Sequence, residues 1–141
     1  MEEAGRITTR LGKDTVIKIP VSPEGLSAIK RLAQDGYITC ATAVFTLSQA
    51  LLAGRAGARY VAPYVNRISD KGNDGVAVTA SIGEAFRKYG IECTVVGASF
   101  KNVRQVEDLS RLGVDSVTLP VDIFDKIITV EGQEEAIVKF E

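Results

Sequence analysis

The chain has 141 residues, of which 45% are hydrophobic and 25% charged, and its 17 Lys and Arg nearly balance its 18 Asp and Glu. This length suits one domain with a real core, and the scattered charges do not favour a nucleic-acid or membrane-surface partner. No apolar run approaches the roughly 20 residues that span a bilayer, and the first residues lack the apolar core of a signal peptide. We therefore expect a cytosolic protein, located in the cytoplasm.

The residue types present narrow the chemistry. The chain has no histidine and two cysteines, Cys40 and Cys93. The lack of histidine excludes Ser–His and Cys–His mechanisms and the common zinc sites. Both cysteines lie in apolar runs, so we expect free thiols rather than a disulfide or a metal pair. Acid–base chemistry would then use Lys, Tyr, Asp, Glu or bound water.

Strand and helix patterns alternate along the chain. Residues 2–11 have a weak helical pattern, and strands are predicted at 15–20, 37–42, 60–65, 93–98 and 116–119. Helices are predicted at 23–34, 43–56, 76–88, 103–112, 122–129 and 134–140. This alternation is typical of βα units with a parallel sheet, so the predicted fold class is α/β.

The first predicted strand contains a lysine in an apolar run. Residues 15–21 read Thr-Val-Ile-Lys-Ile-Pro-Val, which predicts a strand buried on both faces with Lys18 in its middle. Desolvation disfavours the ammonium, and a neutral amine can attack a carbonyl to form a Schiff base. The alternative is a lysine at the strand end whose ammonium reaches water.

Polar side chains follow the ends of the next strands. Thr42, Tyr64, Arg67 and Ser99 stand there, and the carboxyl ends of successive parallel strands converge on one mouth. An arginine fork and a hydroxyl beside a helix start predict an anion site, with phosphate as the natural guest. The polar loop 69–75 is placed to flank such a site.

Each of these residues also has a structural interpretation. Thr42 would cap the helix at 43–56, and Tyr64 would be a core aromatic whose hydroxyl bonds the backbone. Arg67 would be a solvated loop residue and Ser99 a turn residue. The constellation is a stronger signal than any one of its members.

The sequence resembles the small transaldolase family, most closely its fructose-6-phosphate aldolase branch. The resemblance covers nearly the whole chain and rests on residues 16–21, 24–26, 28–30, 42–44, 60–68, 98–101 and 116–120. It implies a (β/α)8 TIM barrel and class I lyase chemistry in carbohydrate metabolism, without metal or cofactor. By the same resemblance, Lys18 is the Schiff-base lysine, and Thr42 and Tyr64 hold the catalytic water and move protons.

The resemblance also assigns the substrate contacts. Arg67 and Ser99 match the contacts to the substrate phosphate, and Ala62 matches a small residue that lines the pocket. The tyrosine at 64 resembles the aldolase branch, because the transaldolase branch typically has phenylalanine there. The implied substrate is a ketose such as fructose 6-phosphate, with release or use of dihydroxyacetone.

The resemblance covers only part of the family's barrel. Residues 1–141 match strands four to eight, so we expect one partial barrel domain that lacks three N-terminal βα units. Five βα units cannot close an eight-stranded barrel. Two alternatives to an aldolase therefore remain: a transaldolase that transfers a three-carbon unit, and an inactive fragment that only binds sugar phosphate. The expected partners are a sugar phosphate or ketose and either further copies of the chain or a complementing chain.

Overall fold

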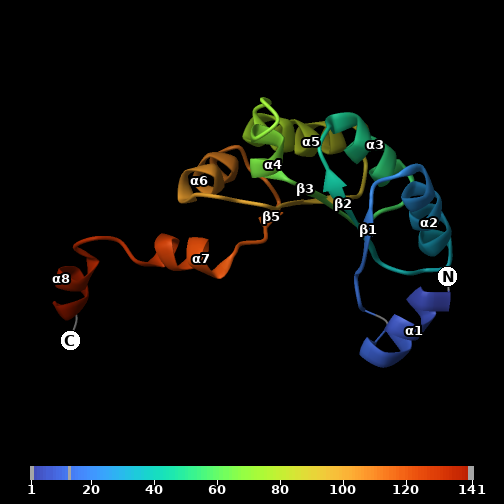
Figure 1. Ribbon diagram of the computed structural model, residues 1–141, viewed down its shortest axis with the longest axis horizontal. Helices are drawn as coiled ribbons and strands as arrows, with labels where there is room; N and C mark the ends of the chain where they lie inside the picture. Colours follow the sequence, from blue (N-terminus) through green and yellow to red (C-terminus); the bar gives the residue numbers. More distant parts are fainter. Residues whose placement is uncertain (1, 13, 140–141) are drawn as a thin grey trace.

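A computed structural model describes residues 2–12 and 14–139 as a parallel sheet flanked by helices (Figure 1). The elements are α1 (Glu2–Leu11), β1 (Ile17–Pro20), α2 (Pro23–Gln34), β2 (Thr39–Val44), α3 (Leu47–Arg55), β3 (Tyr60–Pro63), α4 (Val65–Ser69), α5 (Gly75–Tyr89), β4 (Thr94–Gly97), α6 (Val103–Arg111), β5 (Ser116–Val117), α7 (Val121–Ile128) and α8 (Gln133–Val138). The strands are parallel and follow the chain in the order β1-β2-β3-β4-β5. The fold class is therefore α/β, consistent with part of a βα barrel, as predicted.

Side-chain caps set where four of the helices begin. Ser22, Thr46, Asp74 and Asn102 each accept a hydrogen bond from the backbone N–H three residues later, at 2.9 to 3.2 Å. Such a cap satisfies one of the N–H groups that a helix start leaves unpaired. The cap of α3 is Thr46, so the interpretation of Thr42 as its cap is wrong.

A bulge in β2 explains why this strand ends later than predicted. Its pairing with β3 shifts between Ala41 and Val44, and Ala43 adopts a φ of 54°. One extra residue in a strand reverses the side-chain alternation beyond it. Thr42 therefore stays on the face of the sheet that carries Cys40, while Val44 turns into the core on the opposite face.

The main core lies between the sheet and the helices α2, α3 and α5. Its buried residues are Ile29, Ala41, Val44, Ala50, Ala53, Ala58, Val61, Ile82, Phe86, Cys93 and Val95. In α3 the large side chain of Leu52 does not join this core, because it is 57% exposed. The small residues Ala50 and Ala53 face the sheet instead, because they let α3 approach closely.

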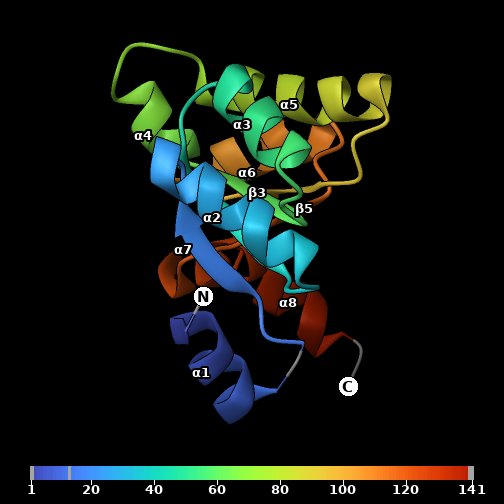
Figure 2. The same ribbon diagram turned by 90° about the vertical axis from the view of Figure 1, so that its right-hand side faces the viewer.

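The opposite face of the sheet is open. Helices α2 to α6 lie on the outer side of the curved sheet, whereas α1, α7 and α8 extend away from that layer of helices (Figures 1 and 2). In β1, Lys18 and Pro20 are exposed, and only Ile17 and Ile19 are partly covered. The prediction that this strand is buried on both faces is therefore wrong for the chain as described.

Other element boundaries differ in small ways. Pro63 is the last residue of β3, a position where a proline is tolerated because no further N–H of the strand is needed for pairing. The short helix α4 after it was not predicted. The predicted end of the last helix, Phe140, lies outside the described residues. Among the helices that the structure describes, none has the length and apolarity to cross a membrane.

Candidate active site

Lys18 lies on the open face of the sheet. In the parallel register, Lys18 is paired with Cys40, and Pro20 is paired with Thr42. Paired residues of adjacent strands point to the same face, so Lys18 and Thr42 share it, with about 8 Å between their Cα atoms by standard strand spacings. Burial raises the pKa of the Cys40 thiol, and the positive charge of Lys18 partly offsets this rise. The ammonium of Lys18 is exposed, so the expected dry environment is not present in the chain as described.

Thr42 and Tyr64 form a direct hydrogen bond. Their hydroxyl oxygens are 3.0 Å apart, and either can be the donor. Thr42 is buried and Tyr64 half-buried, and Ala62, which is 2% exposed, precedes Tyr64 by two residues. The pair thus provides two hydroxyls that can share a proton or hold a water molecule at the carboxyl ends of β2 and β3.

Arg67 lies beside this pair, at the edge of the sheet where the carboxyl ends of the strands meet, which we call the rim. Its guanidinium carbon is 4.7 Å from the centre of the Tyr64 ring, within the range of a cation–π contact. Phe45 also contacts Tyr64: the two rings pack edge to face, with 5.8 Å between their centroids. Lys71 lies 5.5 Å from the centre of the Phe45 ring. The rim therefore combines positive charges with aromatic rings, which suits an anionic ligand.

Ser99 comes next along the rim. Its φ of 63° is in the left-handed region, which non-glycine residues rarely adopt. The backbone N–H of Asn66 donates to the Ser99 carbonyl at 2.8 Å, and the N–H of Val65 donates to Ala98 at 2.8 Å. These bonds join the loop after β4 to the loop after β3, so residues 67 and 99 belong to one rim.

The described site thus brings together most of the predicted residues. Thr42 forms a hydrogen bond with Tyr64, and the Tyr64 ring is stacked with Arg67. The backbone of Ser99 is joined to this group by the hydrogen bond from Asn66. Lys18 shares their face but makes no hydrogen bond or ion pair with the described residues. Strained backbone at the ends of β2 and β4, at Ala43 and Ser99, is also typical of functional sites.

Sequence reasoning missed two contributors. Phe45 follows directly after β2, and no periodicity distinguishes it from a core aromatic. Gln105 stands three residues after the cap Asn102, which is the spacing of a capping box. That spacing indicates a bond to the backbone at the start of α6, although the structure places it at Lys101, one residue before the cap. It does not indicate the contact with Asn66, which is 39 positions away.

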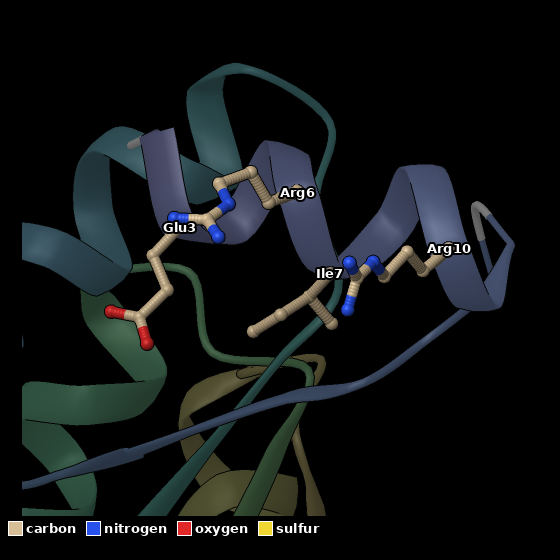
Figure 3. A pocket seen from close by; sticks show the side chains of 4 residues that line it. All are labelled: Glu3, Arg6, Ile7 and Arg10. Carbon is tan, nitrogen blue, oxygen red and sulfur yellow. The ribbon is translucent and has the colours of Figure 1, made fainter.

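A hollow on the surface lies apart from this site. It lies beside α1 and is lined by Glu3, Arg6, Ile7 and Arg10 (Figure 3). All four side chains come from one helix, and none of the predicted site residues lines the hollow. It therefore does not compete with the strand ends as the candidate active site.

The five parallel strands, with polar groups at their carboxyl ends, are consistent with part of a βα barrel, the class of fold in which active sites form at that end. Comparison with known families extends this assignment. The model of the transaldolase/fructose-6-phosphate aldolase family matches residues 1–140. The chain belongs to this family, and the resemblance of its motifs is thereby confirmed at the family level. A function of the aldolase or transaldolase type follows from that membership.

Proposed function

We propose that this chain carries the catalytic lysine of a class I aldolase that acts on a ketose such as fructose 6-phosphate. The single observation that supports it most is the Thr42–Tyr64 hydroxyl pair on the face of the sheet that carries Lys18. A nucleophilic amine beside groups that can move protons is the minimum arrangement for Schiff-base chemistry.

The proposed reaction proceeds through an iminium. The Lys18 amine attacks the ketone carbon, and loss of water gives the iminium. A water molecule takes the proton of the hydroxyl on the β-carbon, and the bond between the α- and β-carbons breaks. The β-carbon leaves as an aldehyde, and the bonding electrons move toward the iminium nitrogen to give an enamine. Water held by Thr42 and Tyr64 protonates the enamine carbon. Hydrolysis then frees dihydroxyacetone and regenerates Lys18.

Arg67 and Ser99 are the proposed phosphate contacts, with Ala62 lining the pocket. The guanidinium of Arg67 is exposed at the rim, where it can form two parallel hydrogen bonds to a phosphate. Its stacking on Tyr64 would place the phosphate end of the substrate beside the proton-transfer pair.

The open face bears on how the lysine would be activated. A lysine loses its proton more readily when it is desolvated, but Lys18 is exposed. We therefore propose that residues 1–141 form one partial barrel domain that matches strands four to eight. Three more βα units would cover Lys18, and the partners proposed to complete the site are further copies of the chain or a complementing chain.

A trapping experiment tests the proposal. The chain is incubated with fructose 6-phosphate and borohydride, and the reduced adduct is located by mass spectrometry. We expect the adduct at Lys18 and none in Lys18→Met. Lys30→Met, which changes an exposed lysine on α2, is the matched control and should keep the adduct. A folded chain that forms no adduct at Lys18, either alone or with the complementing βα units added, would refute the proposal.

The exposure of Lys18 favours a second candidate, a chain that binds sugar phosphate without turnover. Phosphate binding without an adduct, followed by turnover once complementing βα units are added, would support it. Tyr64 favours aldolase over transaldolase, because its hydroxyl can serve the water that protonates the enamine. Comparing free dihydroxyacetone with transfer to erythrose 4-phosphate separates these two reactions.

A further inference from the structure

One side chain, that of Gln105 on α6, connects helix α4, which carries Arg67, with the loop after β4, which carries Ser99. Its Oε1 accepts a hydrogen bond from the Lys101 backbone N–H at 2.9 Å. Its Nε2 donates to Oδ1 of Asn66 at 3.1 Å. Gln105 thus holds the loop after β4 with one end of its amide and the turn after β3 with the other.

Asn66 uses its remaining groups to orient the turn that carries Arg67. Its side-chain Nδ2 donates to Asp70 at 3.0 Å, across one turn of α4. Its backbone N–H donates to the carbonyl of Ser99 at 2.8 Å. The contacts of Asn66 therefore reach α4, the Ser99 loop and α6, and all three meet beside the proposed phosphate contacts.

The conformation of Ser99 requires such support. A positive φ at a non-glycine residue persists only where the surrounding structure holds it. The Asn66 bond fixes the backbone at Ser99 itself, and the Gln105 bond fixes it two residues later, at Lys101. One of these hydrogen bonds is made by Asn66 and the other by Gln105, and the two residues are bonded to each other.

We propose that Gln105 and Asn66 are positioning residues, which set the separation of Arg67 and Ser99 and thereby the preference for a phosphorylated ligand. This inference rests on the anion-binding role given to Arg67 and Ser99 in the proposed function. An arginine fork and a hydroxyl bind a phosphate together only when their separation matches its oxygens, because hydrogen bonds weaken steeply away from their preferred geometry.

The simpler interpretation is that Gln105 only completes the cap of α6. The chain contains a matched control for it in Gln49. Asn102 and Gln105 cap α6 as Thr46 and Gln49 cap α3. Oε1 of Gln49 accepts from the Phe45 backbone N–H at 2.8 Å, as Oε1 of Gln105 does from Lys101. Among the described contacts, only Gln105 adds a bond from its Nε2 to a second loop.

The test titrates inorganic phosphate into the full chain by isothermal calorimetry. We expect Gln105→Met to weaken phosphate binding by about tenfold, comparable to the net contribution of one hydrogen bond. Gln49→Met loses the equivalent cap contact and should bind phosphate within about twofold of the parent. Thermal unfolding of both variants reports the shared loss of the cap, so stability alone cannot produce the difference in binding.

A second variant approaches the same bond from its other end. Asn66→Ala removes the bridge and leaves the cap contacts of α6 intact. It should weaken phosphate binding by a similar factor, and the double variant should be no weaker than the stronger single variant, because both changes break one connection. Additive losses, or a Gln105→Met chain that binds phosphate as the parent does, would overturn the inference.

Failure of the proposed function gives a different result. If no adduct forms at Lys18, the aldolase mechanism fails, but the phosphate titration is unaffected. If Arg67→Met binds phosphate as well as the parent, or the parent binds none, the anion site is absent and the positioning inference is overturned with it.

Discussion

The hydroxyl oxygens of Thr42 and Tyr64 are 3.0 Å apart, although the two residues are 22 positions apart in the chain. The bond depends on the alternation along β2, which places Thr42 on the same face as Cys40, and on the end of β3 at Pro63, after which Tyr64 turns toward it. Two neighbouring strand ends thus present a pair of hydroxyls to the face that carries Lys18.

Removing one hydroxyl of this pair tests its role in proton transfer. We expect Tyr64→Phe to slow dihydroxyacetone release by about 10²- to 10⁴-fold, the usual contribution of a positioned general acid or base. The borohydride adduct at Lys18 should persist, because the amine and the ketone are unchanged. Enzymatic detection of dihydroxyacetone measures the release.

Tyr60→Phe is the matched control for this change. Tyr60 is the first residue of β3, the strand that Tyr64 follows. It is also half-buried and makes no side-chain hydrogen bond among the described contacts. Its variant should release dihydroxyacetone at the parent rate. Equal losses in the two variants would show that aromatic packing, rather than the Tyr64 hydroxyl, matters.

The bulge at Ala43 predicts an unusual response to glycine. Ala43 has a φ of 54°, where an L-residue with a Cβ is strained by about 1–2 kcal/mol. Glycine relieves this strain but loses more backbone entropy on folding, and the two effects nearly cancel. Ala43→Gly should therefore leave the free energy of unfolding unchanged or raise it by up to about 1 kcal/mol. Urea unfolding measures the difference.

Ala41→Gly provides the comparison within the same strand. Ala41 is fully buried in regular β structure, so glycine there loses a packed methyl group and gains no relief of strain. We expect it to destabilise the chain by about 1 kcal/mol or more. If both glycine variants were destabilised equally, the left-handed conformation at position 43 would be wrong.

Two glycines of α5 should respond in opposite directions to alanine. A Cβ on Gly75 would lie 1.9 Å from the carbonyl oxygen of Val65, so α4 and α5 would have to move apart. A Cβ on Gly83 would meet only the flexible end of Arg87, at 3.4 Å. Gly83→Ala should therefore stabilise the chain by up to about 1 kcal/mol, the difference in helix propensity.

Gly75→Ala should destabilise it by several times that amount, about 2–4 kcal/mol, because the clash is with backbone at the start of a helix. Arg67 lies in α4, so the same variant should also weaken phosphate binding. Chemical denaturation of the two variants measures the sign of each change. A stable Gly75→Ala chain would contradict the close packing of α4 on α5.

The buried thiol of Cys93 predicts a dependence of stability on alkaline pH. Burial raises its pKa to about 12, whereas an unfolded thiol ionises near pH 8.5. Above that pH the unfolded state releases a proton that the folded state keeps, so stability is full at lower pH and falls as the pH rises toward 12. The slope for one such group approaches about 1.4 kcal/mol per pH unit.

Cys93→Ala should lower stability at pH 7 and flatten this slope, as unfolding at a series of pH values would show. Cys40→Ala should flatten it less, because Cys40 is half-buried and Lys18 opposes the rise in its pKa. An unchanged alkaline slope in Cys93→Ala would mean that the thiol is not buried as described.

Much of the architecture follows from local patterns in the sequence. Ser22 and Pro23 start α2 and Asn102 starts α6 because caps act within three residues, and the apolar periodicity then sets the length of each helix. The succession of strand and helix is sufficient for the parallel α/β class. The polar residues that follow the strands were also sufficient to predict one shared site at the carboxyl ends of the sheet.

Tertiary structure decided what these patterns could not. The bulge at Ala43 and the left-handed Ser99 arise from pairing with neighbouring strands, so no local propensity predicts them. Whether Lys18 is dry depends on which chain covers its face, and an apolar strand sequence is the same in either case. The Gln105–Asn66 bridge joins residues far apart in the chain, because side chains meet across a sheet only once its register is set.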